Sequence, residues 1–231
     1  MQNINQYIDH TLLKPTATEM EFRKLCEQAI QHHFKAVCVP PHYVSFVKQF
    51  TDLLHDLPYP YNQQVGEVFK ICTVVGFPLG YQTTYAKIAE TQKALSDGAD
   101  EIDMVINLTA FKSMAYESVK SEIKAICDLV HQHDAILKVI IETAYLDNFE
   151  IRIICEICEE IGVDFVKTST GFAPKGAEIE QVKFMREILP PNIKIKASGG
   201  IKTYENAVAF IEAGADRIGT SNGVNIVERA S

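Results

Sequence analysis

Short runs of apolar residues alternate with longer amphipathic stretches along almost the whole chain. The runs are rich in Val and Ile, which is typical of strands that are buried on both faces of a sheet. Counting a short run near the amino terminus, we expect eight strands, at residues 8–12, 36–39, 69–77, 102–106, 136–141, 165–168, 193–197 and 217–219.

The stretches between these runs have the apolar spacing of amphipathic helices. Val119, Ile123, Ile126 and Val130 follow one another at helical intervals, so they share one face. We expect helices at residues 19–32, 43–54, 85–96, 114–131, 149–161, 178–188 and 204–213. This strand–helix alternation predicts an α/β fold, a closed (β/α)8 or TIM barrel in a single domain of residues 1–231. An open, doubly wound sheet is the alternative.

A repeated motif joins three of the expected helices to the strands that follow them. Gly98, Gly162 and Gly214 are each followed by Ala or Val and then by Asp. A glycine at this place closes a helix in the left-handed conformation, and an apolar run begins directly after the motif. We interpret the motif as a recurring helix-to-strand junction.

The charge and the cysteine pattern narrow the classes of function. Thirty acidic and 22 basic side chains give a formal net charge of −8, which repels a phosphate backbone, so we expect no nucleic-acid partner. No run approaches about 18 consecutive apolar residues, so we expect no membrane span. The polar amino terminus and six Cys within apolar segments are typical of a cytoplasmic protein with reduced thiols. The sequence leaves homo-oligomer formation open.

Four of the expected strands contain a charged residue, at Asp103, Lys138, Lys167 and Lys196. A buried, unpaired charge is costly, so such residues persist when they compensate one another or serve chemistry. If they point into one barrel, neighbouring ammonium groups repel, and one lysine becomes a neutral amine near neutral pH. A neutral, enclosed lysine is the nucleophile of Schiff-base aldolase chemistry. The spacing leaves open which lysine attacks, and inert ion pairing is the alternative for each.

The last three expected strands end in small residues. The segments are Thr170-Gly171, Ser198-Gly199-Gly200 and Gly219-Thr220-Ser221-Asn222-Gly223. Backbone N–H groups among small side chains can approach an anion closely, and barrels of this kind commonly bind phosphate after the last two strands. We therefore expect a small phosphorylated carbonyl compound as substrate, with simple tight turns as the alternative.

Three other motifs favour structural roles. Cys155 and Cys158 share a helix and have no second Cys or His pair at zinc spacing, so we expect core packing and neither a metal nor a cofactor. His131 and His133 end a helix, where we expect surface positions. Residues 76–80, Gly-Phe-Pro-Leu-Gly, follow a strand and form either the rim of the active site or a plain turn.

Five segments in order resemble the deoxyribose-phosphate aldolase family. They are Val-Val-Gly-Phe-Pro-Leu-Gly at 74–80, Glu-Ile-Asp-Met-Val-Ile-Asn at 101–107, Lys-Val-Ile-Ile-Glu-Thr at 138–143, Val-Lys-Thr-Ser-Thr-Gly-Phe at 166–172 and Lys-Ala-Ser-Gly-Gly-Ile at 196–201. The resemblance begins at Ile-Asp-His-Thr-Leu-Leu-Lys-Pro, residues 8–15, and covers nearly the whole chain. It implies reversible cleavage of 2-deoxy-D-ribose 5-phosphate to D-glyceraldehyde 3-phosphate and acetaldehyde by a cofactor-free class I mechanism.

The resemblance also implies roles for individual residues. Lys167 would form the Schiff base, Lys196 would be the positive neighbour that favours its neutral form, and Asp103 would move protons together with Lys196 and a water molecule. The phosphate would bind at the strand ends described above, at Thr170, Gly171, Ser198, Gly199, Gly200, Gly219, Thr220 and Ser221.

Three positions depart from the pattern of the family. Pro40 stands where Asn is common, Thr109 where Gly is common, and Asn222 where a small Ser or Ala is usual. Pro40 lacks an N–H group and Asn222 adds bulk beside the expected phosphate. These departures therefore bear on the affinity for the substrate and on the rate of the reaction. Two alternatives to the implied activity are another Schiff-base aldolase or transaldolase of the barrel type and a barrel that binds sugar phosphates without catalysis.

Overall fold

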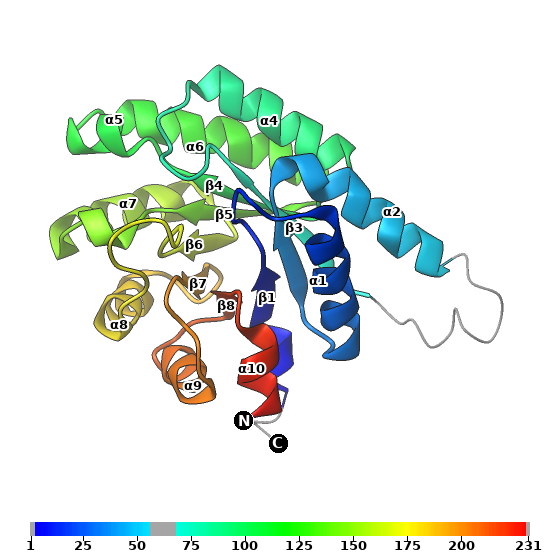
Figure 1. Ribbon diagram of the computed structural model, residues 1–231. Coiled ribbons are helices and arrows are strands. Elements are labelled where there is room, and N and C mark those ends of the chain that lie inside the picture. Colours follow the sequence, from blue (N-terminus) through cyan, green and yellow to red (C-terminus); the bar gives the residue numbers. More distant parts are fainter. Residues whose placement is uncertain (1–2, 56–67, 230–231) are drawn as a thin grey trace.

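The computed structural model describes residues 3–55 and 68–229. Its eight strands pair in parallel and in chain order, and β8 pairs with β1, so the sheet closes into a barrel (Figure 1). The strands are β1 (Ile8–Thr11), β2 (Ala36–Val39), β3 (Lys70–Val75), β4 (Glu101–Val105), β5 (Ile136–Ile140), β6 (Phe165–Lys167), β7 (Lys194–Ser198) and β8 (Arg217–Thr220). The predicted closed barrel is confirmed, and the open-sheet alternative is wrong.

Helices surround the barrel on the outside (Figure 1). Seven of them lie where the apolar spacing predicts, with ends that differ by a few residues: α1 (Glu19–Gln31), α2 (Val44–His55), α4 (Thr84–Ser96), α6 (Tyr116–His131), α7 (Asn148–Ile161), α8 (Ile179–Ile188) and α9 (Tyr204–Glu212). Short elements that the pattern did not predict are η1 (Ile4–Tyr7), η2 (Pro41–Tyr43), α5 (Leu108–Lys112), η3 (Thr143–Tyr145) and α10 (Gly223–Glu228).

One predicted helix start needs correction. The helix expected from residue 114 begins at Tyr116, because Met114 has a left-handed backbone with φ of 59°. This break separates α6 from α5, which begins where the Asn107 side chain accepts a hydrogen bond from the Ala110 N–H at 3.0 Å. The single domain expected over 1–231 includes residues 1–2, 56–67 and 230–231, which lie outside the described part of the chain.

The repeated Gly-Ala/Val-Asp motif is a helix-to-strand junction, as predicted. Its three glycines all have positive φ, between 80° and 109°. The aspartate adds a contact that the pattern did not reveal, because each carboxylate accepts a backbone N–H from the preceding strand. Asp100 accepts from Ile71 at 2.7 Å, and Asp164 and Asp216 accept from Leu137 and Ile195 at 2.9 Å. The motif therefore ties β3 to β4, β5 to β6 and β7 to β8.

Residues of each strand alternate between two environments. In β4, Ile102 and Met104 belong to the large apolar layer between the barrel and its helices. Glu101 and Asp103, the alternate residues, belong to the barrel interior and are fully buried. The same alternation brings charged side chains of other strands into the interior, so the fold gathers residues that are far apart in the sequence.

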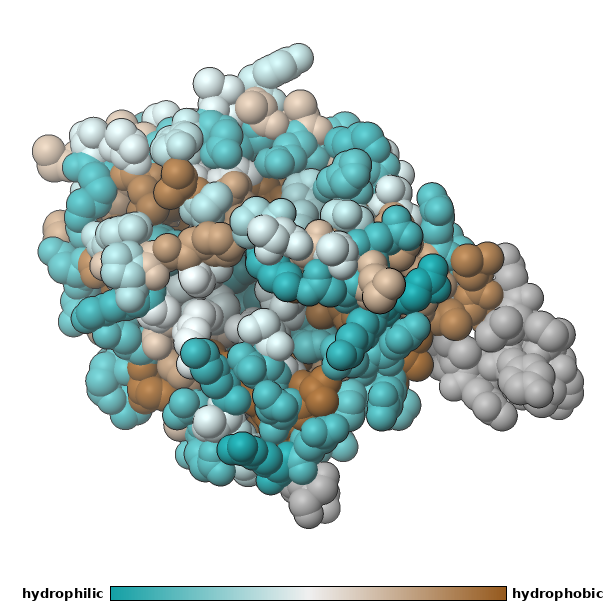
Figure 2. Space-filling model, viewed as in Figure 1, coloured by the Kyte–Doolittle hydropathy of each residue, from teal (hydrophilic) through white to brown (hydrophobic). Residues whose placement is uncertain are grey.

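One face of the molecule is largely polar. Figure 2 shows hydrophilic residues covering most of the face that is also seen in Figure 1, with hydrophobic groups lying between them. Within the described residues, no helix combines the length and the apolar character needed to cross a membrane.

Candidate active site

Charged side chains from six strands meet inside the barrel. They are Asp9, Glu101, Asp103, Lys138, Lys167, Lys196 and Arg217, all of them buried. Asp103 is the centre of the group. Its Oδ1 lies 2.9 Å from Lys138 Nζ, and its Oδ2 lies 2.7 Å from both Lys167 Nζ and Lys196 Nζ. The sequence predicted that these four residues converge, and the structure brings all of them together.

The remaining contacts close a ring of alternating charges. Lys196 also contacts Asp9 at 2.6 Å, and Asp9 is paired with Arg217. Arg217 in turn contacts Glu101 at 2.6 Å, and Glu101 contacts Lys138 at 2.6 Å. The order around the ring is Asp9, Arg217, Glu101, Lys138, Asp103 and Lys196. Three cations and three carboxylates thus compensate one another completely, and Lys167 is attached to the ring from outside it.

The ring contacts favour the ionised forms of Asp103, Asp9 and Lys196. Burial alone would raise the pKa of Asp103, but the charges of Lys138, Lys167 and Lys196 outweigh burial and hold that pKa well below its usual value. Burial likewise opposes ionisation of Asp9, yet Lys196 and Arg217 lower its pKa to about 2. For Lys196, burial favours the neutral amine, and the carboxylates of Asp103 and Asp9 raise the pKa well above its usual value.

Lys167 differs from the ring lysines in its access to solvent. Its side chain is 4% exposed and forms part of the wall of a cavity of about 340 Å³. Lys138 and Lys196 are fully buried. All eight residues that the sequence assigned to phosphate binding line the same cavity: Thr170, Gly171, Ser198, Gly199, Gly200, Gly219, Thr220 and Ser221. Asn222, one of the departures from the family pattern, also lines it.

The hydroxyl groups of this cavity wall are engaged within the protein. Ser198 Oγ donates to the Ser169 carbonyl at 2.8 Å, and Thr220 Oγ1 donates to the Ile201 carbonyl at 2.7 Å. These bonds hold the loops in place and leave the backbone and the small side chains to face the cavity. Gly199 is required by close packing, since an added Cβ would lie 2.9 Å from the Cα of Gly176.

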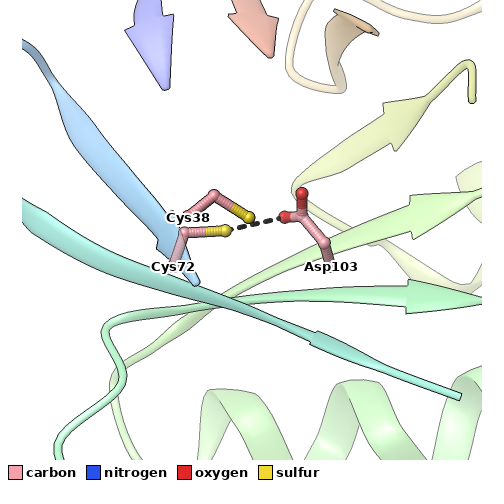
Figure 3. Close-up of side chains that lie close together, drawn as sticks. All are labelled: Cys38, Cys72 and Asp103. Carbon is pink, nitrogen blue, oxygen red and sulfur yellow. Dashed lines mark hydrogen bonds between the residues drawn. The ribbon is translucent and has the colours of Figure 1, made fainter. Parts of the chain in front are cut away.

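Two thiols lie beside the charged residues. Cys38 of β2 and Cys72 of β3 are register partners, and both side chains point toward Asp103 (Figure 3). Cys72 donates to Asp103 Oδ1 at 3.2 Å. Cys38, Cys72 and Asp103 place ligand atoms within 4.8 Å of one another, a grouping that spacing in the sequence did not reveal. The three ammonium groups around Asp103 put positive charge where a metal ion would bind, so the set fits a cation poorly.

Two of the weaker motifs have the structural roles that the sequence favoured, and the third, for which the sequence left two roles open, combines a turn with a contact to the cavity wall. Cys155 and Cys158 are buried in α7. His131 lies at the protein surface and contacts Asp164 at 2.9 Å. Residues 76–80 form a turn, closed by a hydrogen bond from Gly80 N to Gly76 O, and the ring of Phe77 lies edge-on to that of Phe172 on the cavity wall.

Among the buried charged residues that sequence reasoning missed, four lie in or beside this site: Asp9, Glu101, Glu142 and Arg217. Glu101 and Arg217 are the first residues of their strands, and a charged residue at such a position is normally interpreted as an exposed strand end. Asp9 stands inside an expected strand, and the rule that singled out Asp103 applies to it equally. Glu142 lies two residues after the end of β5, and its burial comes from contacts with another loop, which no local pattern encodes.

Comparison with known proteins agrees with this geometry. A family model described as DeoC/LacD family aldolase matches residues 4–229. A deoxyribose-phosphate aldolase of Thermococcus gammatolerans is 49% identical over 228 residues, which are 99% of this chain and 96% of that protein. Among solved structures, QR15, an aldolase, is similar with a TM-score of 0.89 and 42% identity, covering 100% of this chain and 96% of its own.

A second solved structure is a deoxyribose phosphate aldolase from Aeropyrum pernix, described as a unique tetrameric structure. It has a TM-score of 0.86 and 33% identity, and the match covers 98% of this chain and 90% of that chain. Barrel and site together define a (β/α)8-barrel enzyme whose cavity contains a buried lysine. The chain belongs to the DeoC/LacD family of aldolases.

Proposed function

We propose that this aldolase reversibly cleaves 2-deoxy-D-ribose 5-phosphate to D-glyceraldehyde 3-phosphate and acetaldehyde through a Schiff base on Lys167. The observation that carries the proposal is the position of Lys167 Nζ, which reaches the glycine-lined cavity and contacts Asp103 at 2.7 Å. An amine in this place can attack the aldehyde carbon of a substrate whose phosphate is bound by the loops after β6, β7 and β8.

The neutral charge ring supports the choice of Lys167 as the nucleophile. Lys138, Lys196 and Arg217 each contact two carboxylates, so loss of a proton from any of them would break two buried ion pairs, whereas loss of a proton from Lys167 would break its pair with Asp103. Lys167 is the fourth cation beside three carboxylates in this group. Its deprotonation leaves the ring balanced, and attack on a carbonyl requires the deprotonated amine.

Lys196 and Asp103 are proposed to assist the proton transfers of the reaction. Attack of the amine gives a carbinolamine, whose hydroxyl leaves as water after protonation, and the protonated imine then accepts the electron pair of the breaking carbon–carbon bond. The hydroxyl proton of the departing aldehyde must be removed, and the resulting enamine must be protonated. Asp103 Oδ2 bridges Lys167 and Lys196 at 2.7 Å from each, which provides a short route for these protons with a water molecule.

The cavity wall is proposed to bind the phosphate group mainly through backbone N–H groups. Gly171, Gly199 and Gly200 have positive φ and no side chain, so an anion can approach the main chain closely. With a net charge of −8 for the whole chain, this local arrangement is what attracts the anionic substrate. The chemistry requires neither a metal nor a cofactor, because the protonated imine is itself the electron sink.

We further propose that the enzyme acts in the cytoplasm as a homo-oligomer. The six cysteines are all free and buried, which suits a reducing compartment. The described tetrameric structure of the Aeropyrum pernix relative supports self-association. Light scattering coupled to size-exclusion chromatography measures the molar mass directly, and a mass of one 25.9 kDa chain would contradict the oligomer.

The reaction is tested with purified enzyme and 2-deoxyribose 5-phosphate, by measuring D-glyceraldehyde 3-phosphate and acetaldehyde separately. We expect both products in equal amounts, and the reverse condensation when the two aldehydes are supplied. A transaldolase or an aldolase for longer sugars would accept a ketose donor in place of acetaldehyde. A barrel that only binds sugar phosphates would bind the substrate without forming either product.

A further inference from the structure

Glu142 is a buried carboxylate outside the charge ring. It lies two residues after the end of β5, is 2% exposed, and has a left-handed backbone with φ of 52° and ψ of 67°. Residues other than glycine, asparagine and aspartate adopt this conformation rarely and at a cost, so surrounding contacts must hold Glu142 in place. Within the described residues, no cation lies at ion-pair distance from it, so hydrogen bonds must compensate the burial of its charge.

Thr170 supplies those hydrogen bonds. Its backbone N–H lies 3.2 Å from Glu142 Oε1 and 3.3 Å from Oε2, and its hydroxyl donates to Oε2. The same hydroxyl accepts the N–H of Phe172 at 3.0 Å. One carboxylate therefore orients the Thr170 hydroxyl, which in turn orients the next turn of the chain.

This contact lies behind the cavity wall. Thr170, Gly171 and Phe172 all line the cavity, whereas Glu142 approaches them from the end of β5. A second bond, from Thr143 N to Thr168 O at 2.8 Å, joins the same two loops. The segment after Lys167 is thus held at two points, Thr168 and Thr170, to the residues that follow β5. Gly171, with φ of 86°, comes directly after Thr170.

We infer that Glu142 is a positioning residue that holds the wall formed by Thr170, Gly171 and Phe172 in the shape that receives the phosphate group of the substrate. This inference rests on the proposed function. Glu142 acts through Thr170 and is proposed to touch neither the substrate nor the reacting atoms. Its contribution is therefore to phosphate binding, and the chemistry at Lys167 depends on it only indirectly.

The influences on the pKa of Glu142 indicate that Glu142 and Thr170 depend on each other. Burial raises the pKa of Glu142, while the hydrogen bonds from Thr170 and the positive charge of Lys167 oppose that rise. Without the Thr170 hydroxyl, the carboxylate loses a partner, and without the carboxylate, the hydroxyl loses its acceptor. The effects of removing either residue should therefore overlap.

The test compares a phosphorylated with an unphosphorylated substrate. Glu142→Ala, Thr170→Val and the double variant are assayed on 2-deoxyribose 5-phosphate and on 2-deoxyribose. We expect each single variant to raise KM for the phosphorylated substrate about tenfold, the scale of one hydrogen bond to a charged group. For the unphosphorylated substrate, kcat/KM should change less than about threefold. The double variant should resemble the single ones, and Glu142→Gln, which retains one acceptor oxygen, should be intermediate.

Asp164→Asn is the matched control. Like Glu142, Asp164 has a carboxylate that accepts a backbone N–H. Its donor is Leu137, near the start of β5, whereas Glu142 lies beyond the end of that strand. Asp164→Asn should lower the melting temperature without discriminating between the two substrates. Equal losses on both substrates in the Glu142 and Thr170 variants, or additive effects in the double variant, would overturn the positioning role. If Glu142→Ala does not fold, Glu142→Gln and Thr170→Val give the same comparison. A wild-type enzyme that cleaves neither substrate would instead refute the proposed function.

Discussion

Lys167 and Lys196 share one carboxylate oxygen, since the Nζ atom of each lies 2.7 Å from Asp103 Oδ2. The two lysines are register partners on the adjacent strands β6 and β7. Lys196 has a second carboxylate in Asp9, whereas Lys167, within the part of the chain that the structure describes, pairs with the shared one alone and lines the cavity. This asymmetry separates two chemically identical side chains into a permanent cation and a candidate nucleophile.

Replacement of Lys167 by leucine should abolish catalysis while the fold is retained. The charge ring stays complete in Lys167→Leu, because Lys138 and Lys196 still contact Asp103. We expect the rate of substrate cleavage to fall by more than about a thousandfold, with a melting temperature within a few degrees of wild type. Cleavage assays and thermal denaturation measure the two effects. Retention of near wild-type turnover would assign the nucleophile to another residue.

Lys196→Leu should move the pH dependence of imine formation to higher pH. The substitution removes a positive charge from Asp103, so that carboxylate interacts more strongly with Lys167 and favours its ammonium form. We expect the rising limb of borohydride trapping to move to higher pH. Asp103→Asn removes the negative charge instead, so proton transfer should suffer without an alkaline shift.

Lys183→Leu is the control for the change in net charge, because this lysine lies on the exposed surface of α8 and pairs with Glu180. It should leave the trapping profile in place. If the profile of Lys196→Leu also stays unmoved, the electrostatic coupling of the two active-site lysines is wrong, and Lys196 would then act as a contact for the substrate.

The charge ring should make stability depend on pH in the acid range. The pKa of Asp9 is lowered from 3.8 to about 2 in the fold, so its ionised form stabilises the protein above about pH 4, and this stabilisation is lost as the pH falls through about 2. Asp9→Asn leaves Arg217 and Lys196 each without one partner, which should cost about 3–5 kcal/mol near neutral pH. Thermal denaturation at several pH values measures the difference between the proteins. That difference should narrow toward low pH, and a constant difference would show that Asp9 is not ionised in the fold.

Activity should survive removal of divalent metal ions. The cysteine and carboxylate groups that come closest to a metal site share their space with the ammonium groups around Asp103. Incubation with EDTA, followed by buffer exchange and assay, should leave kcat unchanged. A loss of turnover that zinc restores would reveal a catalytic metal.

The barrel could be predicted because its signals are local. Apolar runs, helical spacing and the glycine junctions each lie within a few residues of sequence. The exact start of α6 could not be predicted in this way, since the expected helix includes Met114, whose backbone is left-handed with a φ of 59°.

The site could be predicted in part for a similar reason. Asp103, Lys138, Lys167 and Lys196 stand out because each is charged within an apolar run. The ring contacts depend instead on strand register and on the closure of the barrel, which bring Asp9 of β1 beside Arg217 of β8. No local sequence pattern encodes ion pairs between residues so far apart in the chain. The structure was therefore needed to reveal the neutral charge ring, and to show that Lys167 lies outside it.

The most direct test of the central claim is to incubate the enzyme with acetaldehyde and borohydride and to locate the adduct by peptide mass spectrometry. Reduction of the imine fixes an ethyl group on the attacking amine. We expect this group on Lys167, and Lys167→Leu should acquire none at the active site. An adduct at full yield on Lys138 or Lys196, or active wild-type enzyme that acquires no adduct, would contradict the assignment.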